Sequence, residues 1–481
     1  MILRKTYKSM SRSILLLLTV LVTGTQAQTP LTLAQCIARA EEKNIAVLNA
    51  GLDADLADKN LDRTYWDLAP NLNAGATHGY NYGRVIDRFT NTFATDRVRT
   101  NNFYLSSQLD IFRGLSRLNS IKQAGFDSEA AKAGMEAAKN DVRFNVVQAF
   151  LDVLGLRERI DAAENQAENT RQQIIRTNAL VEGGRVARAE LLSLEAQLAQ
   201  EEYTVTDFRN QHDQRMFALG RALQMDAEEI ERFDITGPAL DATDVIAPTA
   251  TVDEVLANVL ANNPAFAQSG LQLQSAERSI AIARAGALPT LALSGSVGTG
   301  YSGRDVQQVG DPVVGDPVPF GATAGGETVF VPDIRYQTEL TPFNKQLDQN
   351  LNQSIAFQLN IPLFNNMQNK YAIDRARVQH EKSKNSQLNL RNELQQNVLN
   401  ALVQQRSAHR QYIAASKSVD ASTLALEYAQ ERFSQGVITS IEMNTAKNNV
   451  NRSTADLINA KYQYVMASKY LDILQGMPVS L

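Results

Sequence analysis

Residues 68–82, with the sequence LAPNLNAGATHGYNY, contain a change from a helical to an extended pattern. Before Pro70 apolar residues recur at helical spacing, and after it small or apolar residues alternate with polar ones. Proline lacks an amide hydrogen and disfavours helical conformation in the residue before it, so it ends a helix. Alternation predicts a strand with one apolar face. Residues 287–301, ALPTLALSGSVGTGY, make the same change at Pro289, which predicts a second helix-to-strand junction.

The two junctions belong to an internal repeat. An offset of 219 residues relates residues 32–72 to residues 251–291 without a gap. After the strands, an offset of 252 residues relates residues 112–225 to residues 364–477. The second copy therefore carries 33 additional residues (252 minus 219), all between the two matched segments. The chain is a tandem duplication with one variable loop.

Both halves have the same order of predicted elements. A short and a longer helix come first, at 34–43 and 46–68 in one copy and at 253–262 and 265–287 in the other. We expect a first repeat at 28–240, with a strand pair within 70–112 and a helical hairpin at 115–225. The second repeat is expected at 241–481, with a strand pair within 289–364 and a helical hairpin at 367–477. The stretch 302–350, rich in Gly, Pro, Asp and Val, is expected to be an exposed loop.

The hairpins are predicted to be long. Residues 115–180 and 367–433 show helical spacing of apolar residues and contain no proline. At 1.5 Å per residue, such a helix is roughly 100 Å long. Gly184 and Gly436 follow these helices and suit the left-handed conformation that ends a helix. The predicted fold class is mainly α with a small β part.

The first 27 residues have the pattern of a secretory signal peptide. Basic residues precede an apolar run at 14–22, and small residues follow at the expected cleavage position, Ala27. The run is shorter than the roughly 20 residues that a membrane-spanning helix needs. The mature chain is thus expected to leave the cytoplasm. Its single cysteine, Cys36, lies on the apolar side of a helical pattern and is expected to be buried.

Charge, residue spacing and the absence of known motifs argue against several classes of protein. A net charge of −5 and 21% charged residues give no clustered basic excess, so we expect no nucleic-acid partner. The four histidines lack metal-ligand spacing, and no nucleophile motif surrounds them. Glycines 295, 298 and 300 lie in an alternating strand rather than in a phosphate-binding loop. We expect no enzyme activity, no cofactor and no metal site.

Several motifs together resemble those of the TolC family of outer-membrane efflux proteins. They are the Leu-Ala-Pro-Asn-Leu and Leu-Pro-Thr-Leu junctions at residues 68–72 and 288–291, the strand end 109–114 and the hairpin turn 433–437. Single motifs are weakly specific, but their order is repeated twice at constant offsets. The resemblance covers essentially the whole mature chain.

The resemblance implies an architecture and a function. Long helical hairpins would form an α-barrel, and four strands per subunit would contribute to a trimeric transmembrane β-barrel in the outer membrane of a Gram-negative bacterium. The implied function is an exit duct for a tripartite efflux pump or for type I secretion. Its implied partners are two further copies of the chain, a periplasmic adaptor, an inner-membrane transporter of the RND, ABC or MFS type, and outer-membrane lipid. A soluble periplasmic adaptor or scaffold built of helical hairpins is the alternative.

The resemblance also assigns candidate site residues. Members of the family constrict the pore at the periplasmic hairpin ends with acidic residues, and matching positions are Glu442 and Thr445. Because Thr445 is not acidic, the closing contacts must differ, and the first hairpin offers Arg188 and Glu190. A simpler reading of Glu442 is stabilisation of a helix amino terminus. The adaptor would dock at the hairpin tips: Gly184, Arg185, Gly436 and Val437.

Aromatic residues near the strand ends are candidates for the membrane interface. Such residues flank the apolar band of outer-membrane barrels. The candidates are Tyr80, Tyr82, Tyr301 and Phe364.

Overall fold

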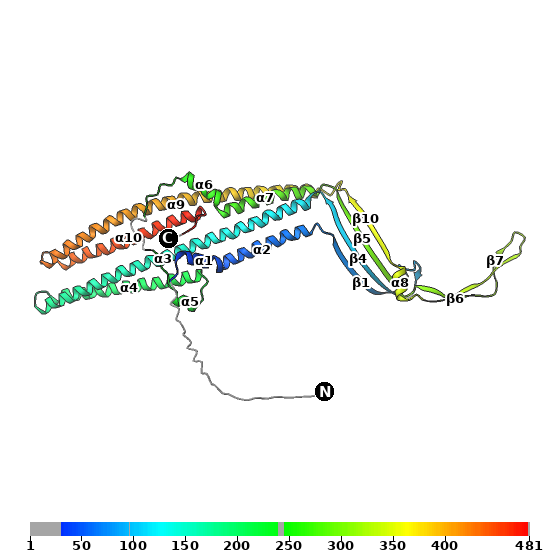
Figure 1. Cartoon of the computed structure of the whole chain (residues 1–481), viewed down its shortest axis with the longest axis horizontal. Helices are drawn as coiled ribbons and strands as arrows, with labels where there is room; N and C mark the ends of the chain where they lie inside the picture. Colours follow the sequence, from blue (N-terminus) through cyan, green and yellow to red (C-terminus); the bar gives the residue numbers. More distant parts are fainter. Residues whose placement is uncertain (1–29, 96, 239–244, 480–481) are drawn as a thin grey trace, which may run out of the picture. The chain divides into compact units, whose positions relative to one another are not determined.

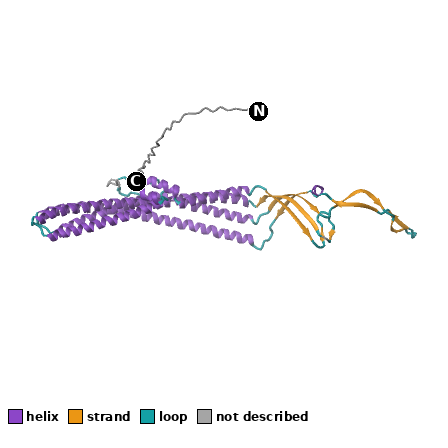
Figure 2. Cartoon of the chain, turned by 90° about the horizontal axis from the view of Figure 1, so that it is seen from below, coloured by secondary structure: helices purple, strands orange, loops and turns teal. Residues whose placement is uncertain are grey.

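A computed structural model describes residues 30–95, 97–238 and 245–479. The predicted signal peptide lies outside these residues. The chain is mainly helical with a small β part, as the sequence predicts (Figures 1 and 2). No helix among the described residues is both long and apolar enough to cross a membrane.

The helices follow the repeat. The first copy contains α1 (Leu33–Lys43), α2 (Ile45–Trp66), α3 (Ser116–Glu182), α4 (Arg188–Ala222) and α5 (Ala227–Arg232). The second contains α6 (Val252–Asn262), α7 (Pro264–Ala285), α8 (Phe343–Gln349), α9 (Gln368–Ser434) and α10 (Ser440–Leu474). The predicted helix ends are within a few residues of these bounds. Helices α3 and α9 each have 67 residues.

Matching caps start the corresponding helices of both copies. The side chain of Asn44 accepts a hydrogen bond from the backbone N–H of Ala46 at the start of α2. Asn263, 219 residues later, accepts from the N–H groups of Ala265 and Phe266 at the start of α7. Each cap satisfies amide groups that the first helical turn leaves without a partner.

Contacts between residues divide the chain into two compact units, and the boundaries of these units differ from those of the predicted repeats. The described part of one unit comprises residues 30–39 and 146–238, and that of the other comprises residues 40–95, 97–145 and 245–479. The first has a core that includes Cys36, Phe150 and Leu219. In the second, Val259 of α6 packs with residues of α9 and α10. The division of the chain into two repeats stays a prediction from the sequence.

One four-stranded antiparallel sheet lies within the second unit. Its strands are β1 (Asn71–Asn81), β4 (Val98–Arg113), β5 (Thr290–Ser302) and β10 (Asn352–Asn360), and they lie side by side in the order β1-β4-β5-β10. The two strand pairs that the repeat predicts are therefore joined through β4 and β5. Strands β1 and β10 form the edges.

Left-handed residues join the sheet to both long helices. Gly114 and Leu115 have φ values of 59° and 65° between β4 and α3. Asn366 and Met367, the residues 252 positions later, have φ values of 52° and 63° before α9. Both copies thus make the same sharp turn, for which glycine and asparagine are suited.

The stretch expected to be a loop contains β-structure instead. Strand β6 (Val306–Val314) pairs with β9 (Ile334–Leu340), and β7 (Val318–Ala322) pairs with β8 (Thr328–Val331). The glycines and prolines of this stretch were interpreted as signs of a loop. Gly310 and Pro312 instead lie where the β6–β9 register shifts. Such residues mark bulges as well as loops. A short β-hairpin, β2 (Val85–Ile86) and β3 (Phe93–Ala94), follows β1.

Candidate functional site

The sheet has one polar face. Register places residues of the four strands in rows, and one set of rows contains Tyr104 and otherwise small and polar side chains, among them Asn73, Thr77, Ser106, Gln108, Ser294, Ser296, Ser354 and Gln358. Serine hydroxyls connect neighbouring strands on this face, as the hydrogen bond of 2.8 Å between Ser296 and Ser354 shows. A surface of this kind suits contact with water.

The opposite face is apolar and open. Its rows contain Leu72, Ala74, Phe103, Leu105, Leu109, Leu291, Leu293, Val297, Ile355, Phe357 and Leu359. Ile355 is 81% exposed, and no described element covers β10 on this side. Soluble monomers rarely expose a contiguous apolar surface that extends over four strands. Strands with an apolar outer face and a polar inner face are typical of barrels that span a membrane.

No described strand pairs with the outer edge of β1 or of β10. Successive strands are antiparallel, so β10 runs opposite to β1. The β10 edge of one copy can therefore pair antiparallel with the β1 edge of another. Four strands cannot close a barrel alone, and free edges favour pairing with further copies.

Three of the four candidate interface aromatics are exposed. Tyr80 and Tyr82 lie at the end of β1, and Phe364, 76% exposed, lies after β10. Tyr301 differs, because it is only 2% exposed. The Phe343 ring of α8 and the Arg99 guanidinium cover it, and Arg99 donates a hydrogen bond of 2.7 Å to its hydroxyl. A helix that the sequence did not predict therefore covers Tyr301 within the chain, while the membrane-interface role of the four aromatic residues stays a prediction.

The end of the first hairpin is a glycine turn. Gly184 has a φ of 68°, and the N–H of Arg185 donates to the Leu180 carbonyl, which closes α3. Arg188 and Glu190 lie in the first turn of α4. One carboxylate oxygen of Glu190 is buried and has no hydrogen-bond partner among the described residues. The closing contacts proposed for Arg188 and Glu190 stay a prediction.

The second hairpin ends in the same way and starts its return helix with a capping box. Gly436 has a φ of 74°, and the N–H of the exposed Val437 donates to the Arg432 carbonyl. At the start of α10 the Glu442 carboxylate accepts hydrogen bonds from the backbone N–H and the hydroxyl of Thr439, at 2.9 and 3.1 Å. These bonds, with a smaller contribution from Arg432, lower the pKa of Glu442. The carboxylate is charged at neutral pH and exposed.

Thr445 lies one turn further along α10. Its hydroxyl donates to the backbone carbonyl of Ile441 at 2.8 Å. Thr445 thus carries no charge and is satisfied locally, while Glu442 supplies a charge beside it. The structure brings Glu442 and Thr445 together on one helix and shows that Glu442 also serves the cap.

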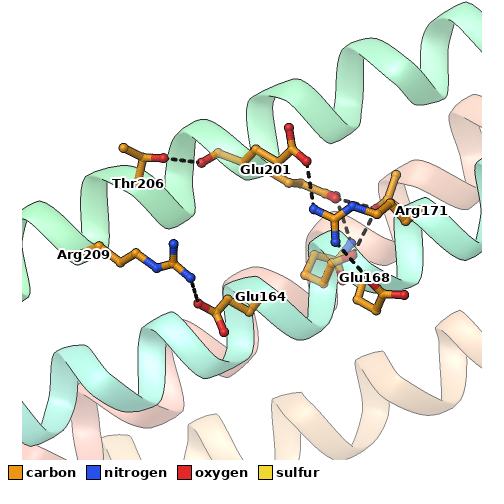
Figure 3. Close-up of polar contacts among 9 residues, drawn as sticks. Glu164, Glu168, Arg171, Glu201, Thr206 and Arg209 are labelled. Carbon is orange, nitrogen blue, oxygen red and sulfur yellow. Dashed lines mark hydrogen bonds and ion pairs between the residues drawn. The ribbon is translucent and has the colours of Figure 1, made fainter.

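Polar contacts between α3 and α4 were not predicted. Arg171 of α3 pairs with Glu202 of α4 at 2.8 Å. Arg209 pairs with Glu164 at 2.5 Å, as Figure 3 shows. The buried Thr170 hydroxyl donates to Glu201. At the positions 252 residues later, Ser422 and Ser453 are hydrogen bonded at 2.7 Å. Both hairpins therefore have a hydroxyl contact at equivalent positions of the sequence, which only a comparison of the two copies could have indicated.

In the described ranges, 30–95, 97–238 and 245–479, no group of three His, Cys, Asp or Glu side chains is placed to hold a metal ion.

Comparison with protein families identifies the chain. A family model described as outer membrane efflux protein matches residues 36–223 and 255–476. The chain belongs to this family. It is an outer-membrane efflux channel, a duct that serves pumps and extends into the periplasm. Channels of the family are trimers that work with efflux pumps.

Solved channels share this fold. The Campylobacter jejuni CmeC outer membrane channel is 16% identical, with a TM-score of 0.73 over 92% of this chain and 85% of that one. Vibrio cholerae VceC is 13% identical, with a TM-score of 0.73 over 92% and 96%. The open state of Neisseria gonorrhoeae MtrE is 18% identical, with a TM-score of 0.68 over 92% and 89%. No curated protein sequence matches the chain.

Proposed function

We propose that three copies of this outer-membrane efflux protein close one twelve-stranded barrel and one helical tunnel, through which substrates pass without covalent chemistry. The observation that carries this proposal is the four-stranded sheet, with its polar face, its apolar face and its two free edges. Three sheets in sequence pair every edge and turn all polar rows to one lumen.

Exposed apolar side chains on the helices next to the edge strands support the same arrangement of three copies. Leu48, Leu52 and Leu56 form a stripe along α2, and Leu52 is 64% exposed. Helix α9 has exposed apolar side chains too, among them Val378 and Leu388. Helix α2 leads into the edge strand β1, and α9 follows the edge strand β10. The helices next to both edge strands thus have exposed apolar surface that a neighbouring copy of the chain can cover.

The hairpin ends are proposed as the gate and the docking site. Glu442 of three copies would place three charges around the aperture, where a ring of carboxylates favours cations. Thr445, Arg188 and Glu190 complete the proposed gate. The tips, Gly184, Arg185, Gly436 and Val437, would contact a periplasmic adaptor that links the duct to an inner-membrane transporter of the RND, ABC or MFS type. Opening would require neighbouring hairpins to slide, a shear motion biased by the adaptor.

Fractionation and reconstitution test the proposal. The mature protein should remain in washed outer membranes, require detergent for extraction and form cation-preferring channels in planar bilayers. A soluble periplasmic adaptor would instead appear in an osmotic-shock supernatant and form no channels, which would overturn the duct. Mass measurement of the detergent-solubilised protein should give three chains per particle.

A further inference from the structure

The loop after β1 lies on the polar face of the sheet. Its hairpin, β2–β3, contains Asp87 and Phe89 near its turn. The Ser302 hydroxyl donates a hydrogen bond to Asp87, and a methyl group at Gly300 would overlap the Phe89 ring. Gly300 and Ser302 alternate with Tyr301 along β5 and so share a face with Ser294 and Ser296. The loop therefore starts at β1 and reaches β5, beyond β4, on the polar side of the sheet.

Buried hydrogen bonds hold this loop in one conformation. One Asp87 carboxylate oxygen accepts from the N–H groups of Phe89 and Thr90, at 2.9 and 3.2 Å. The N–H of Asp87 donates to the Thr92 carbonyl at 2.9 Å, and that of Asn91 donates to the Asp87 carbonyl at 2.8 Å. Asp87 is only 2% exposed. A buried carboxylate with these hydrogen bonds fixes the backbone of the residues around it, so the loop has a defined conformation at the end of the strands.

Helix α8 covers the opposite face at the same level. Phe343 packs edge-to-face against Phe103, which belongs to the apolar rows, and also against Tyr301. The Thr299 hydroxyl donates to the Leu347 carbonyl at 2.5 Å. The buried Gln346 side chain accepts from the Ser302 N–H at 2.8 Å and donates to the Ser302 carbonyl at 3.0 Å. The end of β5 is thus held between α8 outside and the loop inside.

The exposed side chains of the loop carry positive charge. Arg84 and Arg88 are both exposed, and the Arg84 guanidinium lies 4.9 Å from the centre of the Phe93 ring. Asp87, the acidic residue between them, is buried and bonded to its own loop and to β5. In the proposed duct the polar face lines the lumen, so the loop carries these two guanidinium groups at the end of the strands where solutes would leave.

We propose that residues 84–93 form a basic collar inside the extracellular mouth of the duct, which narrows the exit and favours anionic solutes there. Three copies place six guanidinium groups around the opening, and fixed charges in a narrow pore select ions through their field. The collar rests on the proposed trimeric duct. It is separate from the acidic periplasmic aperture and would act on a solute after that aperture has opened.

Cysteine modification during single-channel recording tests the position of the collar. Cys36 is buried, so a new cysteine is the accessible thiol. Arg88→Cys places a thiol in the collar, and Lys345→Cys places one on α8, outside the barrel. A bulky, membrane-impermeant methanethiosulfonate added from the extracellular side should reduce the current of Arg88→Cys channels in three steps. It should leave Lys345→Cys channels unchanged, although mass spectrometry shows both labelled. Equal currents before and after full labelling of Arg88→Cys would overturn the collar.

A charge measurement tests its selectivity independently. In a gradient of about 0.1 M salt, where screening acts over roughly 10 Å, the double variant Arg84→Gln, Arg88→Gln should shift the reversal potential toward cations. Lys345→Gln, which removes a charge from the outer side, should not shift it. An unchanged reversal potential in the double variant refutes the selectivity of the collar. Wild-type protein that forms no channels at all would instead refute the proposed function, so the two failures are distinguishable.

Discussion

Burial decides the chemistry of the single cysteine. Cys36 lies in α1 with no exposed surface, and desolvation raises the pKa of its thiol to about 12, although Arg39 opposes the shift. Thiolate is the reactive form, so the folded protein should resist thiol reagents. We expect no labelling by maleimide at pH 7.5 over hours, and complete labelling after unfolding in denaturant. Mass spectrometry checks this, and rapid labelling of the native trimer would show that Cys36 is accessible.

Glu442 has two separable roles, a cap and a charge. Hydrogen bonds from Thr439 lower its pKa, so its contribution to stability is complete above the ordinary carboxyl pKa of 4.5 and is lost as the pH falls through the lowered value. Glu442→Gln keeps an oxygen that accepts from the Thr439 N–H but removes the charge. We expect reduced cation preference and weaker block by divalent cations, with thermal stability at pH 7 nearly unchanged. Thr439→Val is the matched control, because it weakens the cap and keeps the charge. Unaltered conductance, ion preference and divalent block in Glu442→Gln would contradict the aperture assignment.

The turn between β4 and α3 requires a left-handed backbone and leaves little space for a side chain. Gly114 has a positive φ, and a methyl group there would lie 2.6 Å from the Ala285 carbonyl oxygen. Left-handed conformation costs a residue with a side chain about 1–2 kcal/mol, so Gly114→Ala should destabilise by at least that amount. Asn366→Gly, at the equivalent turn, should be nearly neutral, because both residues tolerate this conformation.

The interior of α3 provides the opposite control. A Cβ added at Gly125 would meet no neighbouring side chain, so Gly125→Ala should stabilise by about 0.5–1 kcal/mol through helix propensity. Urea unfolding in detergent, followed by helical circular dichroism, measures all three variants. A Gly114→Ala protein as stable as the wild type would mean that the turn can adopt another conformation.

Assembly is a property of the whole molecule, and the α2 stripe tests it. Leu52→Glu places a charge on the apolar surface that we assign to the neighbouring subunit, and burying an unpaired charge is costly. The trimer should dissociate in detergent, as light scattering after size exclusion would show, while the helical content of each chain is kept. Gln337→Glu adds the same charge to the exposed β9 ribbon and should leave the trimer intact. A stable Leu52→Glu trimer would place the interface elsewhere.

Periodicity and repetition in the sequence determined most of the architecture. Two junctions at Pro70 and Pro289, read together with the constant offsets, predicted the strands, the long helices and their order, because amphipathic spacing is a local property of the chain. The resemblance of the same motifs to those of outer-membrane efflux proteins indicated the family. The tertiary structure alone decided which strands are neighbours, that α8 buries Tyr301 and that Asp87 ties a loop to the polar face of β5. It also showed that Glu442 caps its own helix, which was one of the two readings of the sequence. Apart from the Glu442 cap, these contacts join residues far apart in the chain, and no spacing rule in a single sequence indicates which distant side chains will meet.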